Sequence, residues 1–103
     1  MSIKLYTLYE STSKNKKYDV YILNRNGNIK KVSFGAKGYS DFTIHKDIKR
    51  RALYRNRHKN DKLHDPTYAG FWSWYVLWGN SSNLHVAFKH TVALAKRLLS
   101  HSS

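Results

Sequence analysis

The chain has 103 residues, which is enough for one domain with a modest hydrophobic core. It carries 19 Lys and Arg against 6 Asp and Glu, a formal net charge of +13, and it has no Cys. This composition excludes disulfides and thiolate metal sites, and it favours a polyanionic partner, because so small a domain repels itself unless its charge is neutralised.

The first third of the chain predicts an antiparallel sheet. Three segments alternate or are rich in aromatic and branched residues, and we expect them to be strands: residues 3–9, 18–24 and 29–34. Asn26-Gly27 lies between the last two segments. It favours a tight hairpin, because both central residues of a type I′ turn adopt positive φ.

Beyond a glycine-containing bend at residues 35–38, the pattern becomes helical. We expect a basic helix that begins near Asp47 and ends at Asn60 or Asp61, with Asp47 as cap or in the first turn. Asp65-Pro66 predicts the start of a second, aromatic helix, with Asp65 as N-cap and proline at the first helical position, and Gly79-Asn80 ends this helix in a left-handed conformation. A third helix, capped by Ser81 or Ser82, runs to about residue 99 and has an apolar face that predicts packing on the sheet.

These elements predict an α+β fold: an N-terminal antiparallel sheet of about three strands with an Asn-Gly hairpin, followed by about three helices. The whole chain, residues 1–103, is expected to form a single domain. It is mainly strands over residues 1–38 and mainly helices over residues 45–100, and residues 101–103 are expected to be a disordered tail.

The run from His45 to Lys62 contains eight Lys or Arg residues but only two acids. Several of these cations fall on one side at a helical period, with little apolar surface opposite, so core packing does not explain the pattern. Binding to a phosphate backbone would explain it, because the release of condensed counterions favours such binding without sequence readout. The predicted nucleic-acid-binding residues are Lys46, Lys49, Arg50, Arg51, Arg55, Arg57 and Lys59, extended by Lys37, Lys30 and Lys31.

The aromatic helix allows two interpretations. A helix that is apolar all round is usually buried, so its aromatic residues fit a hydrophobic core. Alternatively, some of them form an exposed platform that stacks on unpaired bases or docks to a partner protein. The candidates for stacking or docking are Trp72, Trp74, Tyr75 and Trp78.

A spaced motif runs through the middle of the chain: Phe34-Gly35, Tyr39-Ser40-Asp41-Phe42-Thr43 with His45 and Asp47, Tyr54, Arg57-His58, Ala69-Gly70 with Ser73, and Leu77-Trp78. Over about residues 31–92 the chain thereby resembles a small uncharacterised family of basic proteins encoded by large eukaryotic DNA viruses, the nucleocytoplasmic large DNA viruses. The resemblance implies a viral protein located in the virion or in the infected host cell, in the viral factory, cytoplasm or nucleus. It implies no mechanism.

The motif's acids and histidines need a chemical interpretation of their own. Two carboxylates and a His can hold a divalent cation for phosphodiester cleavage. Residues of these types near a helix start also serve as caps and hydrogen-bonded anchors, and Asp41 can pair with Arg50 or Arg57. We prefer this second role and expect no catalytic residue, metal or cofactor; the structural anchors are Asp41, His45, Asp47 and His58.

The glycine-containing loop at residues 35–40 also permits two interpretations. Its glycines suit a turn between strand and helix, whereas successive backbone N–H groups can cradle an anion. It lacks the Walker A spacing, so we do not expect nucleotide hydrolysis.

The leading hypothesis is a small viral nucleic-acid-binding protein that contacts phosphates largely without sequence preference, with DNA favoured over RNA, in genome packaging or in the virion. The alternative is a minor structural protein that docks to acidic capsid subunits, and the third is a metal-dependent nuclease. The chain shows no signal-peptide pattern, and its longest apolar run, residues 71–78, is too short for a bilayer span of about 20 residues. We therefore expect neither secretion nor membrane insertion.

Overall fold

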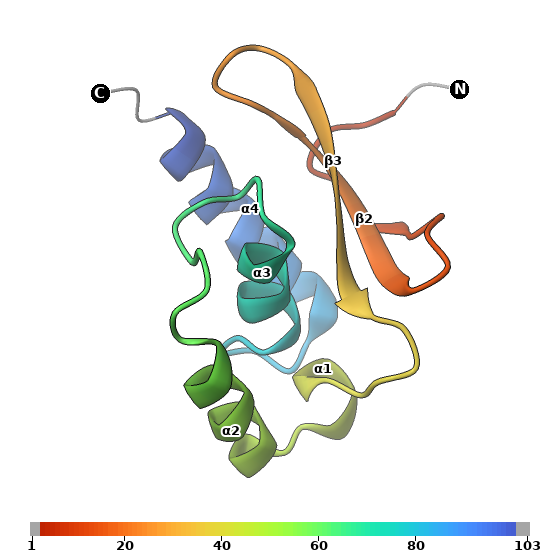
Figure 1. Ribbon diagram of the computed structural model, residues 1–103, viewed down its shortest axis with the longest axis vertical. Coiled ribbons are helices and arrows are strands. Elements are labelled where there is room, and N and C mark those ends of the chain that lie inside the picture. The colour runs from red at the N-terminus through yellow and green to blue at the C-terminus, as the bar shows by residue number, and fades with distance from the viewer. Residues whose placement is uncertain (1–2, 101–103) are drawn as a thin grey trace.

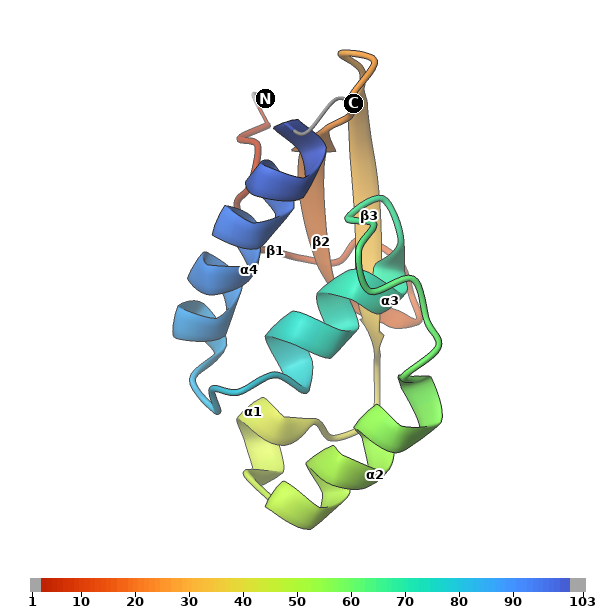
Figure 2. The same cartoon turned by 90° about the vertical axis from the view of Figure 1, so that its left-hand side faces the viewer.

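The computed structural model describes residues 3–100 as a three-stranded antiparallel sheet followed by helices. The strand order is β1-β2-β3, and the helices cover one face of the sheet and continue beyond one of its ends (Figures 1 and 2). The predicted α+β class is therefore confirmed. The tail predicted at residues 101–103 lies outside the described residues.

The sheet consists of one short and two long strands, β1 (Tyr9–Glu10), β2 (Lys16–Leu23) and β3 (Ile29–Ala36). The strand predicted at residues 3–9 is wrong, since pairing begins only at Tyr9. The cause is Tyr6, whose φ of 56° breaks the extended chain while its N–H donates to the Tyr21 carbonyl at 2.8 Å.

A five-residue loop, residues 24–28, connects β2 and β3, which pair with Val20 opposite Val32. Asn24 donates its N–H to the Asn28 carbonyl, and Gly27 donates its N–H to the Asn24 carbonyl. Gly27 has a φ of 84°, but Asn26 does not have a positive φ. The turn is thus not of the predicted type I′; a left-handed glycine closes a longer loop.

The hydrophobic core lies between one face of the sheet and the helices α3 (Ala69–Trp72), η1 (Ser73–Leu77) and α4 (Leu84–Ser100). Trp72 is at its centre, because its ring is 6.1 Å from that of Phe34 on β3 and 5.9 Å from that of Phe88 on α4. Phe88 and Ala95 of α4 join the same core, so the predicted apolar face of the last helix packs on the sheet side.

The aromatic helix starts later than the sequence predicts. Asp65 accepts hydrogen bonds from the N–H and the hydroxyl of Thr67, at 3.0 and 2.6 Å, so its carboxylate closes a turn instead of capping the helix. Burial alone would raise the pKa of Asp65, but these hydrogen bonds and the charges of Arg25 and Lys30 together outweigh it, and the pKa is lowered. The helix begins only at Ala69, after Tyr68.

The same helix ends in a π-helical turn, in which Trp78 donates its N–H to the Ser73 carbonyl at 3.1 Å. The left-handed end predicted at Gly79 is wrong, because Gly79 has no positive φ. A Cβ at Gly79 would lie 2.3 Å from the Tyr75 carbonyl oxygen, so a close backbone approach requires the glycine. The next helix is capped by Asn83, not by a serine, since the Asn83 side chain accepts from the N–H of Val86 at 3.0 Å.

Two further helices, α1 (Phe42–His45) and α2 (Ile48–His58), lie beyond the end of the sheet (Figure 2). Asp47 caps α2 by accepting hydrogen bonds from the N–H groups of Lys49 and Arg50, as the sequence predicts. The first and last described segments of the chain lie at the opposite end of the molecule, which measures 39 × 34 × 21 Å.

Candidate functional site

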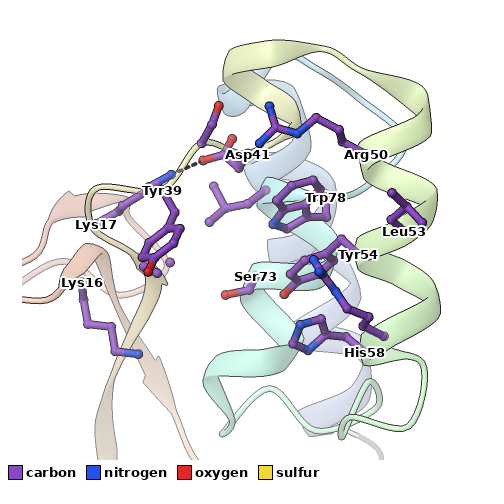
Figure 3. Close-up of a pocket in the computed structure, with 15 residues that line it drawn as sticks. Lys16, Lys17, Tyr39, Asp41, Arg50, Leu53, Tyr54, His58, Ser73 and Trp78 are labelled. Carbon is purple, nitrogen blue, oxygen red and sulfur yellow. Dashed lines mark hydrogen bonds and ion pairs between the residues drawn. The ribbon is translucent and has the colours of Figure 1, made fainter.

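A pocket of about 550 Å³ lies between α2 and the end of the sheet. Figure 3 shows its three sides: β2 with the loop at residues 39–41, the facing side of α2, and η1 at the back. The pocket lies beside α2, where the sequence places its densest positive charge, so we take it and the surrounding cations as the candidate site.

Helix α2 turns one face toward this pocket. Arg50, Leu53 and Arg57 are spaced by three and four residues, and all three line the pocket. They belong to the face that the helical period predicts. Lys46 does not belong to this face of α2, because it ends α1 with a φ of 57° and lies before α2 begins.

The other two arginines of α2 contact protein. The Arg51 guanidinium lies 4.8 Å from the centre of the Phe42 ring and donates to the Gly79 carbonyl at 3.1 Å. The Arg55 guanidinium lies 4.7 Å from the centre of the Trp74 ring. Burial, and after it the charge of Arg51, lowers the pKa of Arg55. The sequence predicts both as phosphate contacts, whereas in the structure they attach α2 to the rest of the molecule.

A column of stacked rings borders the pocket. Tyr54 is stacked on Trp78, with ring centres 4.4 Å apart and an interplanar angle of 5°, and His58 is stacked on the other face of Tyr54 at 4.2 Å. Burial, followed by the charge of Asp61, raises the pKa of Tyr54 to about 12, although a hydrogen bond with Ser73 opposes the rise. Tyr54 therefore remains neutral in the column at physiological pH.

Asp41 is the buried carboxylate of the site, with 1% of its surface exposed. It caps α1 by accepting from the Thr43 N–H at 2.9 Å, and it forms an ion pair with Lys17 of β2 at 2.5 Å. The predicted pairing with Arg50 or Arg57 is wrong, because the Lys17 ammonium of β2 is the cation that pairs with this carboxylate. Both arginines are left without a carboxylate partner.

Of the other five acids in residues 3–100, four have partners other than Lys or Arg, and Glu10 is exposed. Asp19 accepts from Ser11, Thr12 and Ser33, and the remaining interactions are the Asp47 cap, Asp61 with His58, and Asp65 with Thr67. Over residues 3–100, Lys17 with Asp41 is the one ion pair that joins a Lys or Arg to a carboxylate. Most of the positive charge is thus free to meet a ligand.

The four aromatic candidates differ in position. Trp72 is fully buried and donates its indole N–H to the Pro66 carbonyl at 2.8 Å, so the prediction that it stacks or docks is wrong. Trp74 is half-buried beneath Arg55, and Tyr75 is half-buried against Phe71. Trp78 is the one of the four that lines the pocket.

Of the three outlying lysines, Lys30 and Lys31 do not form one surface with α2, whereas Lys37 lies beside the pocket. Lys30 and Lys31 alternate across β3: the Lys30 ammonium lies 5.9 Å from the centre of the Tyr68 ring, whereas that of Lys31 is 3.5 Å from the Thr12 hydroxyl. Lys37 donates its N–H to the Asn15 carbonyl, which places it beside the β2 end of the pocket.

Several residues of the site were not predicted from the sequence. Lys16, Tyr39 and Tyr54 all line the pocket. Tyr39 and Tyr54 are members of the spaced motif, which is the one signal that marks them. Lys16 lies in the strand-rich part of the chain and has no local signal at all.

The two histidine anchors have local partners. His45 accepts from the Asp47 N–H through Nδ1 at 2.9 Å and lies against Trp78, with ring centres 5.2 Å apart. His58 Nδ1 is 2.9 Å from an Asp61 carboxylate oxygen. Within the part of the chain that the structure describes, no three His, Asp or Glu side chains come close enough together to hold a metal ion. Nor is any described helix long and apolar enough to cross a bilayer.

Fold and site together define a basic α+β protein with an aromatic, cation-rimmed pocket at the end of its sheet. Residues 6–58 match DUF5754, a family of unknown function, and the chain belongs to that family. The match spans β1 to α2 and so includes the strand and α2 sides of the pocket, but not η1. No curated protein and no solved structure matches the chain. The resemblance to a viral family stays a prediction.

Proposed function

We propose that this protein binds nucleic acid without catalysing a reaction on it, chiefly through phosphate contacts and with little sequence preference. The observation that carries the proposal is the group of exposed cations without carboxylate partners on α2 and around the pocket. These residues are Lys37, Lys46, Lys49, Arg50, Arg57 and Lys59. Arg51 and Arg55, which contact protein, are not part of the proposed surface.

The physical basis is the release of counterions. Each phosphate that a cation neutralises frees condensed ions from the nucleic acid, and the gain does not depend on the base sequence. If about five phosphates are contacted, the logarithm of the affinity falls with the logarithm of salt concentration at a slope of roughly −4.5 for a duplex. A protein of this kind is suited to neutralising a packaged genome in a virion, with DNA favoured over RNA.

The first test is a titration of labelled duplex DNA by fluorescence anisotropy at several salt concentrations. The triple variant Lys49→Gln/Arg50→Gln/Arg57→Gln removes three cations from α2. We expect its salt slope to be shallower by roughly 2.7, since each lost contact changes the slope by about 0.9.

The matched control removes three exposed cations elsewhere, with the same change in net charge: Lys4→Gln/Lys89→Gln/Arg97→Gln. We expect this variant to keep the original slope. A salt response that is flat in the unmodified protein would remove the proposal. Equal losses in the two triple variants would show that net charge acts alone, without a surface on α2.

A second candidate function is a minor structural role in which the protein docks to an acidic capsid subunit. One observation favours it: Ile44, Ile48 and Leu53 expose large apolar side chains next to the cations of α1 and α2. Cross-linking of purified particles tests it. Links to capsid protein without links to DNA would favour docking, and links to DNA alone would exclude it.

A further inference from the structure

We propose that the pocket beside α2 holds one unpaired nucleotide of a single strand, with its base inside and its phosphate at the rim. This inference rests on the proposed function and deepens it, because it names single-stranded nucleic acid as the preferred ligand. The first argument is size. A volume of about 550 Å³ falls within the range of small-molecule sites, about 300–1,000 Å³.

The second argument is the aromatic lining on both sides. Tyr39 stands at the pocket opposite α2, with 74% of its surface exposed (Figure 3). Across from it lie the rings of Trp78, Tyr54 and His58. A base that enters between Tyr39 and this column would meet aromatic surface on two sides, which is how proteins hold unpaired bases regardless of their identity.

The third argument is the charge at the rim. Arg50 and Arg57 line the pocket from α2, and Lys16 lines it from β2. A guanidinium group presents a planar pair of donors that matches two phosphate oxygens. Asp41 would repel a phosphate, but its carboxylate is neutralised by Lys17 and satisfied by the α1 cap. The rim is therefore positive, and aromatic rings lie on two sides of the pocket.

The fourth argument concerns the form of the nucleic acid. A base that is paired and stacked inside a duplex presents only its edge, so it cannot fill a pocket with walls on opposite sides. A duplex can use only the phosphate contacts on α2. The pocket would add a contact that only an unstacked base can make, and it would thus raise the affinity for single strands above that for duplex.

The test compares a short single-stranded oligonucleotide with its duplex, by anisotropy, for the variant Tyr39→Ala. Stacking on one aromatic residue corresponds to roughly a 5- to 150-fold effect on affinity. We expect a loss of this size for the single strand and no change for the duplex. Tyr39 is exposed, so its removal does not disturb the core. Tyr68→Ala is the control, because Tyr68 is another exposed tyrosine and does not line the pocket.

A second measurement observes the pocket directly. The protein is labelled with 5-fluorotryptophan, and a mononucleotide, thymidine monophosphate, is added while the fluorine spectrum is recorded. We expect the signal of Trp78, assigned with Trp78→Phe, to shift, and that of Trp72 to stay fixed because Trp72 is in the core.

The outcomes separate the two proposals. If Tyr39→Ala weakens single strand and duplex equally, or if the Trp78 signal does not move, the nucleotide pocket is wrong, while salt-dependent binding would still support the proposed function. If the affinity is insensitive to salt but thymidine monophosphate shifts Trp78, the phosphate surface is wrong and the pocket stands. Absence of both effects overturns both proposals.

Discussion

At the scale of single residues, Asp19 illustrates how this chain satisfies a buried carboxylate without using a cation. It lies in β2 and accepts hydrogen bonds from the hydroxyls of Ser11 and Ser33, at 2.7 and 2.6 Å, and from the Thr12 N–H at 3.2 Å. Burial alone would raise the pKa of Asp19. The three hydrogen bonds, together with the nearby charge of Lys31, outweigh burial and lower the pKa below its usual 3.8.

This arrangement predicts a pH-dependent contribution to stability. Because the pKa of Asp19 is lowered in the folded protein, its contribution is complete above the unfolded pKa and is lost as the pH falls through the folded pKa. We expect Asp19→Asn to lower the free energy of unfolding by about 1–3 kcal/mol at pH 7, and the difference from wild type to shrink below pH ~4.

Urea denaturation at pH 7 and at pH 3 checks this prediction. Glu10→Gln, which changes an exposed carboxylate at the neighbouring strand, is the control and should have little effect at either pH. A deficit for Asp19→Asn that is the same at both pH values would show that the ionised carboxylate is not the stabilising form.

The residues of the site were predictable from the sequence only where they share one element. Arg50 and Arg57 follow from the helical period, because both lie on α2. Lys16 and Tyr39 come from separate segments and meet α2 only after the sheet has formed. No local pattern encodes that meeting. The partner of Asp41 was missed for the same reason, since Lys17 is 24 residues away in the sequence.

At the scale of elements, α2 is a weakly anchored part of the fold, because none of its residues is buried. A helix of 11 residues has little stability of its own. Its attachment depends on the Tyr54 stack and on the contacts of Arg51 and Arg55. The core between the sheet and α4 does not include α2.

We expect Tyr54→Ala to detach α2 locally without unfolding the core. Removal of two stacked contacts, each worth about 0.5–1.5 kcal/mol, should increase amide exchange in α2 by roughly 5- to 150-fold. Exchange in the centre of α4 should stay slow. Hydrogen exchange measured residue by residue by NMR checks this expectation.

The control is Leu53→Ala, because Leu53 is the exposed neighbour of Tyr54 on the same helix and the substitution also introduces Ala. We expect exchange in α2 to change little in this variant. Equal acceleration in both variants would mean that the aromatic stack does not determine how firmly α2 is attached, since Ala itself favours the helix.

Elements were predictable where a local interaction decides them. The Asp47 cap depends on two N–H groups within three residues, and the structure has it as predicted. The prediction that Asp65 caps the helix was wrong, because its carboxylate accepts a hydrogen bond from the nearby hydroxyl of Thr67. The strand expected at residues 3–9 was wrong, because the alternation of residue types along this segment gives no sign of the left-handed conformation of Tyr6.

At the scale of the whole molecule, the charge of +13 dominates the behaviour in solution. Within residues 3–100, the single Lys–Asp ion pair offsets little of it. The fold class was predictable in spite of this charge, because the two hydrophobic periods, two residues for strands and 3.6 for helices, survive in β2, β3 and α4. The pocket was not predictable from the sequence, because its walls come from elements that are far apart along the chain.

The charge predicts that self-repulsion destabilises the free protein. We expect Lys89→Gln, at an exposed position of α4, to raise the free energy of unfolding by up to about 0.5 kcal/mol at low salt. The gain should disappear near 1 M NaCl, where the Debye length is about 3 Å. Thermal unfolding followed by circular dichroism at both salt concentrations checks this.

The uncharged exchange Asn80→Gln, at another exposed position, serves as the control and should show no such salt dependence. A stability gain in Lys89→Gln that persists at high salt would show that repulsion between charges is not its cause.

The placement of α2 at one pole of the molecule, with both ends of the described chain at the other, has a practical consequence (Figure 2). A dye, an affinity handle or a solid support that is attached near either end of the described chain would be held up to about 39 Å from the cationic helix. Such an attachment leaves α2 facing outward, so immobilised copies would present their binding surfaces in a common orientation. In a surface-based binding assay, the protein is therefore best attached at the end opposite α2.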